Sequence, residues 1–237
     1  MGKKNRKIVE ITVFITGGTI DSVERKEDRP KERKLVFFEG EPIVPKIMEE
    51  MVARLNVENL DKPEIRLKFV TPEGLYHDSS KFTRKRMRNL AELIKECASD
   101  NIIVTHGTDY MIRSAKRLIE YLDPNNKKTI VFTGSMDPLA NGPTSDAHQN
   151  LLSTLKAFWD KKEMPKPTVY MCLQEKVMNP VYLIKDLLNS MFKYRGKSQD
   201  AERLRPIDTV IAYQERVKAT REKRHAAKLE KAEALQL

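Results

Sequence analysis

The sequence predicts an α/β protein with a doubly wound, mostly parallel sheet and an appended charged C-terminal helix. Short runs rich in Ile and Val alternate with segments whose apolar residues recur at helical spacing, as in parallel sheets covered by helices on both faces. Two of these runs lead into a glycine followed by a threonine, which is typical of a tight turn at a strand end. The segment after Pro206 lacks Gly and Pro and has a thin apolar stripe, which favours a helix that packs near Ile211 and Val217 and then projects.

Five strands and four helices are expected in chain order. The run Ile8–Ile15 is a buried strand, and the charged, aperiodic segment Asp21–Gly40 is expected to be a long surface loop. Thr83 is the expected N-cap of the second helix, and Asp109 is expected in the first turn of the third, which Asp123-Pro124 ends. The other expected elements are a helix over Pro42–Leu55, strands over Glu64–Val70, Asn101–Thr105, Thr129–Thr133 and Thr168–Leu173, and a helix near Asp146–Trp159.

Composition indicates one domain between two charged ends. The 237 residues are 40% hydrophobic, enough for a core, and 33% charged, which is high for a compact domain. We expect a basic tail over residues 1–7, the α/β domain over 8–205 and a charged helical tail over 206–237. The formal net charge of +10 favours encounter with polyanions, although acids are mixed with bases in residues 25–34 and 216–231, as on a solvated surface.

Cysteine use and the N-terminal residues predict a cytoplasmic protein. Cys97 and Cys172 lie in apolar stretches, which indicates buried thiols in a reducing compartment rather than a disulfide framework. The first apolar run is short, is interrupted by Glu10 and Thr12, and lacks a small-residue cleavage site, unlike a signal peptide. No window is long and apolar enough to cross a membrane, so no membrane partner is expected.

Polar clusters follow the expected strands at their carboxyl ends, where open parallel sheets bind ligands. They cover residues 16–22, 77–80, 105–109 and 133–146, and only the first and third contain Gly directly before Thr. In Gly18-Thr19 and Gly107-Thr108, the glycine allows a close backbone approach, and the threonine places a hydroxyl in the crevice. A hydroxyl becomes a nucleophile when a nearby base takes its proton, and helix N-termini at the same edge can hold a carboxylate. The pattern therefore suits chemistry on a free amino acid.

The ordered strings resemble the L-asparaginase family of the asparaginase/glutaminase, two-threonine type. They are TGGTI from Thr16, Asp78-Ser79-Ser80, THGTDYM from Thr105 and TGSM from Thr133, followed by Asp146 and Asn150. The resemblance spans roughly Ile8 to Lys185. The Ser145-Asp146-Ala147 run before Asn150 is more similar to short, single-domain members of the family than to full-length ones.

The resemblance implies an amidohydrolase that converts L-asparagine to aspartate and ammonia through a threonyl acyl-enzyme, with glutamine as a second candidate substrate. The implied nucleophile is Thr19, and the implied second catalytic group is Thr108, Asp109 and a lysine, for which Lys185 is the candidate. Backbone N–H groups near Thr108 are expected to form an oxyanion hole. The implied substrate-binding residues are Gly18, Asp78, Ser79, Ser80 and Gly107, with Asp109 shared between both roles.

The family also implies no metal or organic cofactor, a small amino-acid amide as partner, and self-association into a homo-oligomer. Its mobile loop after the first threonine carries a tyrosine that assists the nucleophile, whereas residues 22–40 of this chain contain none. Tyr76 and Tyr110 lie near other motifs, outside that loop.

Other functions fit parts of the sequence. A non-catalytic amino-acid-binding domain or an amidotransferase-associated subunit would use the same scaffold. An RNA-binding protein would use the basic face made of Lys81, Arg84, Lys85, Arg86 and Arg88. A dinucleotide site is disfavoured because Gly17-Gly18 does not continue as a Gly-x-Gly-x-x-Gly run, and a zinc site because the histidines and cysteines are scattered.

Overall fold

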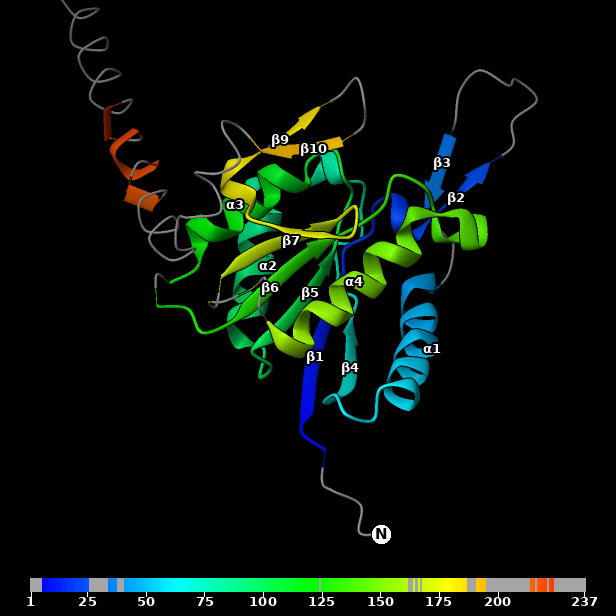
Figure 1. Cartoon of the computed structure of the whole chain (residues 1–237). Helices are drawn as coiled ribbons and strands as arrows, with labels where there is room; N and C mark the ends of the chain where they lie inside the picture. Colours follow the sequence, from blue (N-terminus) through cyan, green and yellow to red (C-terminus); the bar gives the residue numbers. More distant parts are fainter. Residues whose placement is uncertain are drawn as a thin grey trace, which may run out of the picture.

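The computed structural model describes residues 6–25, 34–37, 41–123, 125–161, 164, 166, 168–186, 191–194, 214, 215, 217–220, 222 and 223. Its main feature is a six-stranded sheet with the strand order β4-β1-β5-β6-β7-β8. The first five strands are parallel and β8 is antiparallel to β7, which confirms the predicted mostly parallel α/β fold (Figure 1). The strands are β1 (Ile8–Ile15), β4 (Glu64–Val70), β5 (Asn101–Thr105), β6 (Thr129–Thr133), β7 (Val169–Leu173) and β8 (Lys176–Met178).

Four helices cover the two faces of this sheet. The helices α1 (Ile43–Glu58) and α4 (Asp146–Asp160) pack on one face, and α2 (Arg84–Glu96) and α3 (Met111–Tyr121) pack on the other (Figure 1). Thr83 is the N-cap of α2, as predicted, because its hydroxyl accepts a hydrogen bond from the Arg86 amide at 3.3 Å. The third helix begins at Met111, so Asp109 precedes its first turn instead of lying in it.

Two cores form because successive strand residues point to opposite faces of the sheet. In β5, Ile102 and Val104 pack in the core under α2 and α3, whereas Ile103 packs in the core under α1 and α4. All three side chains are fully buried. At about 1.5–3 kcal/mol for each fully buried aliphatic side chain, these continuous apolar strands fix the sheet between its helix layers. This is why runs rich in Ile and Val identified the central strands from the sequence.

The expected surface loop over Asp21–Gly40 is wrong in part. Residues 22–25 and 34–37 form an antiparallel hairpin, β2 (Ser22–Arg25) with β3 (Lys34–Phe37), in which Ser22 pairs with Phe37. Asp21 itself is fully buried in a short 3₁₀ turn. The two short strands were not predicted because the segment is highly charged. They are stabilised by pairing with each other, and the residue pattern within one strand does not reveal such pairing. Residues 26–33 and 38–40 of this segment lie outside the described residues.

A second hairpin follows the sheet and was not predicted. It consists of β9 (Leu183–Asp186) and β10 (Met191–Tyr194), with Lys185 opposite Phe192. Leu183 and Phe192 are buried against the α3 side of the core, so this small hairpin is anchored by its apolar residues.

The predicted tails are described only near their junctions with the domain. Arg6 of the basic tail donates hydrogen bonds to the carbonyls of Asn56, Asn59 and Lys62 at 2.8–3.1 Å, close to the end of α1. In the C-terminal tail, the described residues from 214 onward are helical, and Gln214 bonds the carbonyls of Ile119 and Leu122. The predicted packing of Ile211 lies outside the described residues.

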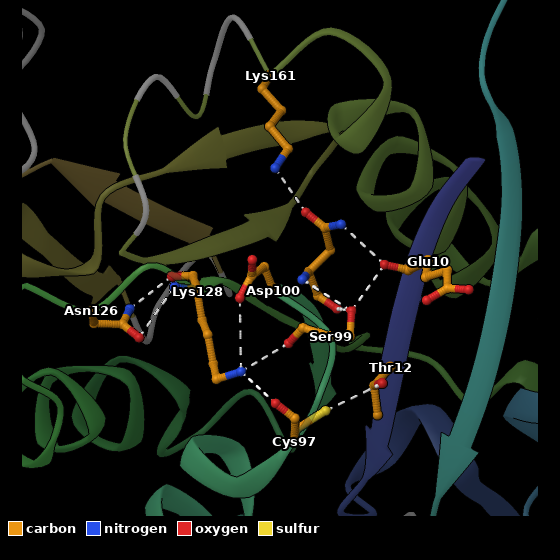
Figure 2. Close-up of polar contacts among 9 residues, drawn as sticks. Glu10, Thr12, Cys97, Ser99, Asp100, Asn126, Lys128 and Lys161 are labelled. Carbon is orange, nitrogen blue, oxygen red and sulfur yellow. Dashed lines mark hydrogen bonds and ion pairs between the residues drawn. The ribbon is translucent and has the colours of Figure 1, made fainter. Parts of the chain in front are cut away.

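A polar network holds the amino-terminal edge of the sheet (Figure 2). Lys128 donates to the carbonyl of Cys97 at 2.5 Å and to that of Ser99 at 3.0 Å, where α2 has just ended. Cys97 is half-buried rather than buried as predicted, and its thiol contacts the Thr12 hydroxyl at 3.4 Å. Lys161 reaches the Asn101 side chain at 2.7 Å. Lys128 thereby satisfies two backbone carbonyls at the end of α2, at the edge of the sheet opposite the polar clusters. No helix in the described part of the chain is long and apolar enough to cross a membrane.

Candidate active site

The carboxyl ends of β1 and β5 define the place where this sheet can hold a ligand. The chain leaves β1 toward α1 on one face, and it leaves β5 toward α3 on the opposite face. Adjacent parallel strands whose connections diverge in this way leave a crevice between them, the topological switch point. Both glycine-threonine turns lie at this position, because Thr19 follows β1 and Thr108 follows β5.

The two turns are in direct contact. A Cβ atom on Gly18 would lie 2.3 Å from the Gly107 nitrogen, and one on Gly107 would lie 2.7 Å from the Ser79 Cβ and Oγ. Gly18 also has a φ of 94° and a ψ of 179°, a conformation that is almost exclusive to glycine. The glycines therefore let three separate sequence motifs approach at one point, with Thr19, Thr108 and Ser79 around it.

Hydrogen bonds fix the strand ends below these turns. The Thr16 hydroxyl donates to the Thr105 carbonyl at 2.5 Å, and the Thr105 hydroxyl accepts from the Thr16 amide at 3.3 Å. Both threonines are fully buried, so water does not compete for these hydrogen bonds. These two bonds, both donated by Thr16 to Thr105, fix the end of β1 against the end of β5 beside the candidate site.

Lys185 reaches this site from the second hairpin. Its ammonium nitrogen lies 2.5 Å from the Asp109 Oδ1 and 3.4 Å from the Thr108 hydroxyl. The lysine side chain is only 11% exposed, whereas the Asp109 side chain is 72% exposed. Lys185 and Thr108 are 77 residues apart in the sequence. The threonine, carboxylate and lysine that the sequence predicted as a group therefore lie together, held by a hairpin that the sequence did not predict.

Comparisons with known proteins identify the family. Residues 10–216 match the family model described as "Asparaginase, N-terminal". The chain belongs to the asparaginase family. It is 24% identical over 182 residues to L-asparaginase 2 of Bacillus subtilis, covering 77% of this chain and 45% of that protein.

Solved structures of asparaginases share this chain's fold. L-asparaginase I from Vibrio cholerae superposes with a TM-score of 0.59 at 24% identity, over 80% of this chain and 51% of its own. The L-asparaginase from Thermococcus kodakarensis gives a TM-score of 0.56 at 23% identity, over 78% of this chain and 51% of its own. This asparaginase-family chain thus spans about half the length of the relatives that it matches.

The loop after β4 supplies the other predicted binding residues. Ser79 is buried beneath Gly107, whereas Asp78 and Ser80 are exposed. The Asp78 carboxylate accepts a hydrogen bond from the Ser80 amide at 2.7 Å and so caps the short 3₁₀ turn Ser79–Lys81. Asp78 is thereby partly occupied in shaping its own loop, while Ser80 faces solvent at the same edge.

Asp21 belongs to the polar cluster of residues 16–22, and it is buried instead of lying at the start of a surface loop. Its buried carboxylate accepts hydrogen bonds from the amides of Ile43 and Val44 at the start of α1, at 2.7 and 3.4 Å, and from the Tyr76 hydroxyl at 3.0 Å. Desolvation raises the pKa of Asp21 above 3.8, although these bonds oppose the rise. Asp21 therefore links the Thr19 turn to α1 and to the loop that carries Ser79. An acid two residues after a Gly-Thr turn was the available signal.

The tyrosines near the motifs have defined contacts. The Tyr76 hydroxyl lies 3.0 Å from both the carboxylate and the backbone carbonyl of Asp21, which places it beside the Thr19 turn. Tyr110 is the N-cap residue of α3 and is 38% exposed, with the Arg113 guanidinium 5.6 Å from its ring centre. Tyr76 thus holds Asp21, which directly precedes the tyrosine-free segment 22–40.

His106 is a structural member of the second turn. It is fully buried between Phe82 and Phe132, with ring centres 4.6 and 5.7 Å away. Its Nδ1 lies 2.8 Å from the Gly107 carbonyl, and burial lowers its pKa to about 4, so the ring is neutral near pH 7 with Nδ1–H as donor. This bond orients the peptide that carries Gly107 toward Thr108.

Asp146 and Asn150 hold the loop that follows β6. The Asp146 carboxylate accepts hydrogen bonds from the amides of Met136 and Asp137 at 3.0–3.1 Å, and Asn150 donates to the Gly134 carbonyl at 2.9 Å. These residues therefore shape the turn that follows β6. Their appearance in the ordered motif set is explained by this loop geometry.

Proposed function

We propose that this chain hydrolyses the side-chain amide of L-asparagine through a threonyl acyl-enzyme. The observation that supports it most is the Thr108–Asp109–Lys185 cluster beside the Gly18–Gly107 contact. A charged lysine, an acid and a hydroxyl at a topological switch point match the chemistry of an activated hydroxyl nucleophile. Membership of the asparaginase family adds to this support.

Thr19 is the proposed nucleophile. Its half-buried side chain follows Gly18, at the turn that contacts Gly107. In the first step, its hydroxyl oxygen bonds the amide carbon, its proton passes to the leaving nitrogen, and ammonia departs. In the second step, water attacks the acyl-Thr19 ester and releases aspartate, and the hydroxyl regains its proton. Backbone N–H groups of the Thr108 turn would stabilise the negative oxygen of each tetrahedral intermediate.

Thr108, Asp109 and Lys185 form the proposed proton relay. As an ammonium ion, Lys185 donates to both Asp109 and the Thr108 hydroxyl. Once the ammonium has passed one proton to solvent, the neutral amine can accept the hydroxyl proton of Thr108, which then acts as a base toward water or toward Thr19. General acid–base groups of this kind contribute about 10²–10⁴-fold to rate.

The substrate's two charged groups also have proposed partners. Asp109 is exposed enough to meet an ammonium group while still contacting Lys185. Ser80 and the backbone of the Ser79 turn are the proposed contacts for the α-carboxylate. Asp109 and the Ser79–Ser80 turn lie at the carboxyl edge of the sheet. An amino acid bound between them would present its side chain to Thr19.

Ammonia release from asparagine and from glutamine by the purified chain tests the proposal. We expect release that falls by about 10⁴-fold or more in Thr19→Ala, because deletion of a covalent nucleophile has effects of this order. Thr19→Ser keeps a hydroxyl and is the matched control, which should retain measurable turnover. Equal turnover in wild type and Thr19→Ala would exclude Thr19 as nucleophile. Absence of release by the wild type, with asparagine binding seen by calorimetry, would instead favour a non-catalytic binding or amidotransferase-associated role.

A further inference from the structure

The outer face of α2 and α3 carries a cluster of positive side chains that the amide chemistry does not use. Lys81, Arg84, Lys85 and Arg88 are exposed on or just before α2. Arg113 is exposed on α3, which packs beside α2 on the same face of the sheet (Figure 1). We call these five residues, together with Arg117, the α2–α3 basic face.

The guanidinium groups of Arg84, Arg113 and Arg117 lie close enough to influence one another, and of these Arg117 also donates to the Phe82 carbonyl at 3.4 Å and lies near Glu120. The half-buried Arg117 has its pKa lowered by burial and by the nearby charges of Arg113 and Arg84. No carboxylate in the described part of the chain forms an ion pair with Arg84, Arg88 or Arg113. Keeping like charges together costs free energy, which an anionic ligand would recover.

Other basic residues nearby do have intramolecular roles. Arg86, which the sequence grouped with the basic face, turns away from it and donates to the carbonyls of Gly74 and Lys81 at 3.0 and 2.6 Å. Lys95, near the end of α2, pairs with Glu92 at 2.9 Å. Arg84, Arg88 and Arg113 of the α2–α3 basic face form no ion pair with a described carboxylate, so their charge is available to a partner.

The side chains of the face favour a nucleic acid over an anionic lipid surface as its partner. Four of its six residues are arginines, which bind phosphate oxygens in a bidentate manner. Two tyrosines lie against it, because Arg113 is 5.6 Å from the Tyr110 ring centre and Arg88 is 5.6 Å from that of Tyr121. Tyrosine and arginine provide stacking surfaces for unpaired bases. Insertion into a lipid surface requires exposed apolar side chains, and on α2 only Leu93 is a large exposed one.

We propose that the α2–α3 basic face binds the phosphate backbone of single-stranded nucleic acid. Lys81, Arg84, Lys85 and Arg88 would follow the phosphates along α2, and Arg113 would extend the track toward Tyr110, directly after Asp109. This binding is independent of the amide hydrolysis proposed above.

Fluorescence anisotropy of the full-length chain with a labelled single-stranded RNA of about 20 nucleotides tests the proposal. The test variant is Arg84→Gln/Arg88→Gln/Arg113→Gln, and the matched control is Lys46→Gln/Arg54→Gln/Lys156→Gln, which removes the same charge from exposed positions on α1 and α4. The logarithm of the affinity falls with the logarithm of the salt concentration by about 0.7 for each phosphate contact. Without three contacts, the fold-loss of affinity between about 50 and 200 mM salt is therefore about 18-fold smaller than in wild type. We expect this reduction in the test variant and not in the control.

A second measurement uses the unmodified protein. Bound RNA should protect Lys81 and Lys85 from acetylation more than Lys46, as read by mass spectrometry, and this does not depend on the folding of any variant. Equal affinity and equal salt slope in the test variant and wild type would overturn the proposal, as would an equal loss in the control. Binding to phosphatidylserine vesicles that depends on the three arginines, without RNA binding, would assign the face to a membrane surface instead.

Discussion

Substitution of Gly18 by alanine tests whether the two glycine-threonine turns touch. Gly18 has φ 94° and ψ 179°, and Gly142, in the loop before α4, has φ 76° and ψ −153°. Both lie in the backbone region that is nearly exclusive to glycine, so alanine costs about 1–3 kcal/mol at either position. They differ in the available space, because a Cβ on Gly142 has no neighbour within 4 Å, whereas one on Gly18 overlaps the Gly107 backbone.

The overlap at Gly18 should cost about 1–3 kcal/mol more than the strain alone, since backbone atoms cannot rotate away as a side chain can. With a urea dependence of about 3 kcal/mol per molar, the unfolding midpoint of Gly18→Ala should lie about 0.3–1 M below that of Gly142→Ala. Urea unfolding followed by circular dichroism measures both midpoints. Identical midpoints would refute the contact between the turns, and with it the placement of Thr19 beside the Thr108 turn.

Three further predictions concern residues around the site. Lys185→Met should lower the rate of ammonia release by about 10²–10⁴-fold without changing Thr108 or the fold. Steady-state kinetics measures this rate, and an unchanged rate would contradict the relay. Tyr76→Phe should lower the free energy of unfolding by about 1.5–3 kcal/mol, because the buried Asp21 carboxylate loses a donor; a urea midpoint equal to that of wild type would show that this bond contributes nothing. His106 has a folded pKa of about 4, below its ordinary value of 6.5, so the unfolded chain takes up this proton first and stability is lost as pH falls from 6.5 toward 4. For wild type, this lowers the free energy of unfolding by about 2 kcal/mol between about pH 7 and pH 5. Urea unfolding at both pH values measures the loss, which should be absent in His106→Gln.

The sheet and the motif turns could be predicted from local patterns. The bounds of β1, β4, β5 and β6 agree with the sequence prediction. Runs rich in Ile and Val identified the buried strands β1, β5 and β6, and alternation of apolar with charged residues identified the partly exposed β4. The position of Thr19 and Thr108 at the carboxyl edge followed from the order of strands and helices. Lys185 was found through the family resemblance, although its hairpin was not.

Contacts between distant segments escaped prediction. The β2–β3 and β9–β10 hairpins are short and partly charged, and each is stabilised by its partner strand instead of by a pattern of its own. Asp21 appeared to be a loop residue because its three partners, Ile43, Val44 and Tyr76, lie 22 to 55 residues away. A buried carboxylate is recognisable only when the donors that satisfy it are known.

The sequence by itself determined the α/β fold class, the four central strands and the residues of the family's motifs, since these depend on periodicity, turn chemistry and ordered strings within short segments. The tertiary structure decided which of those residues meet. It brought Gly18 against Gly107, Lys185 against Asp109 and Asp21 beneath Tyr76, and it turned Arg86 away from the α2–α3 basic face. The physical reason is that close packing and hydrogen bonding across segments depend on the final positions of backbone atoms, which no local pattern specifies.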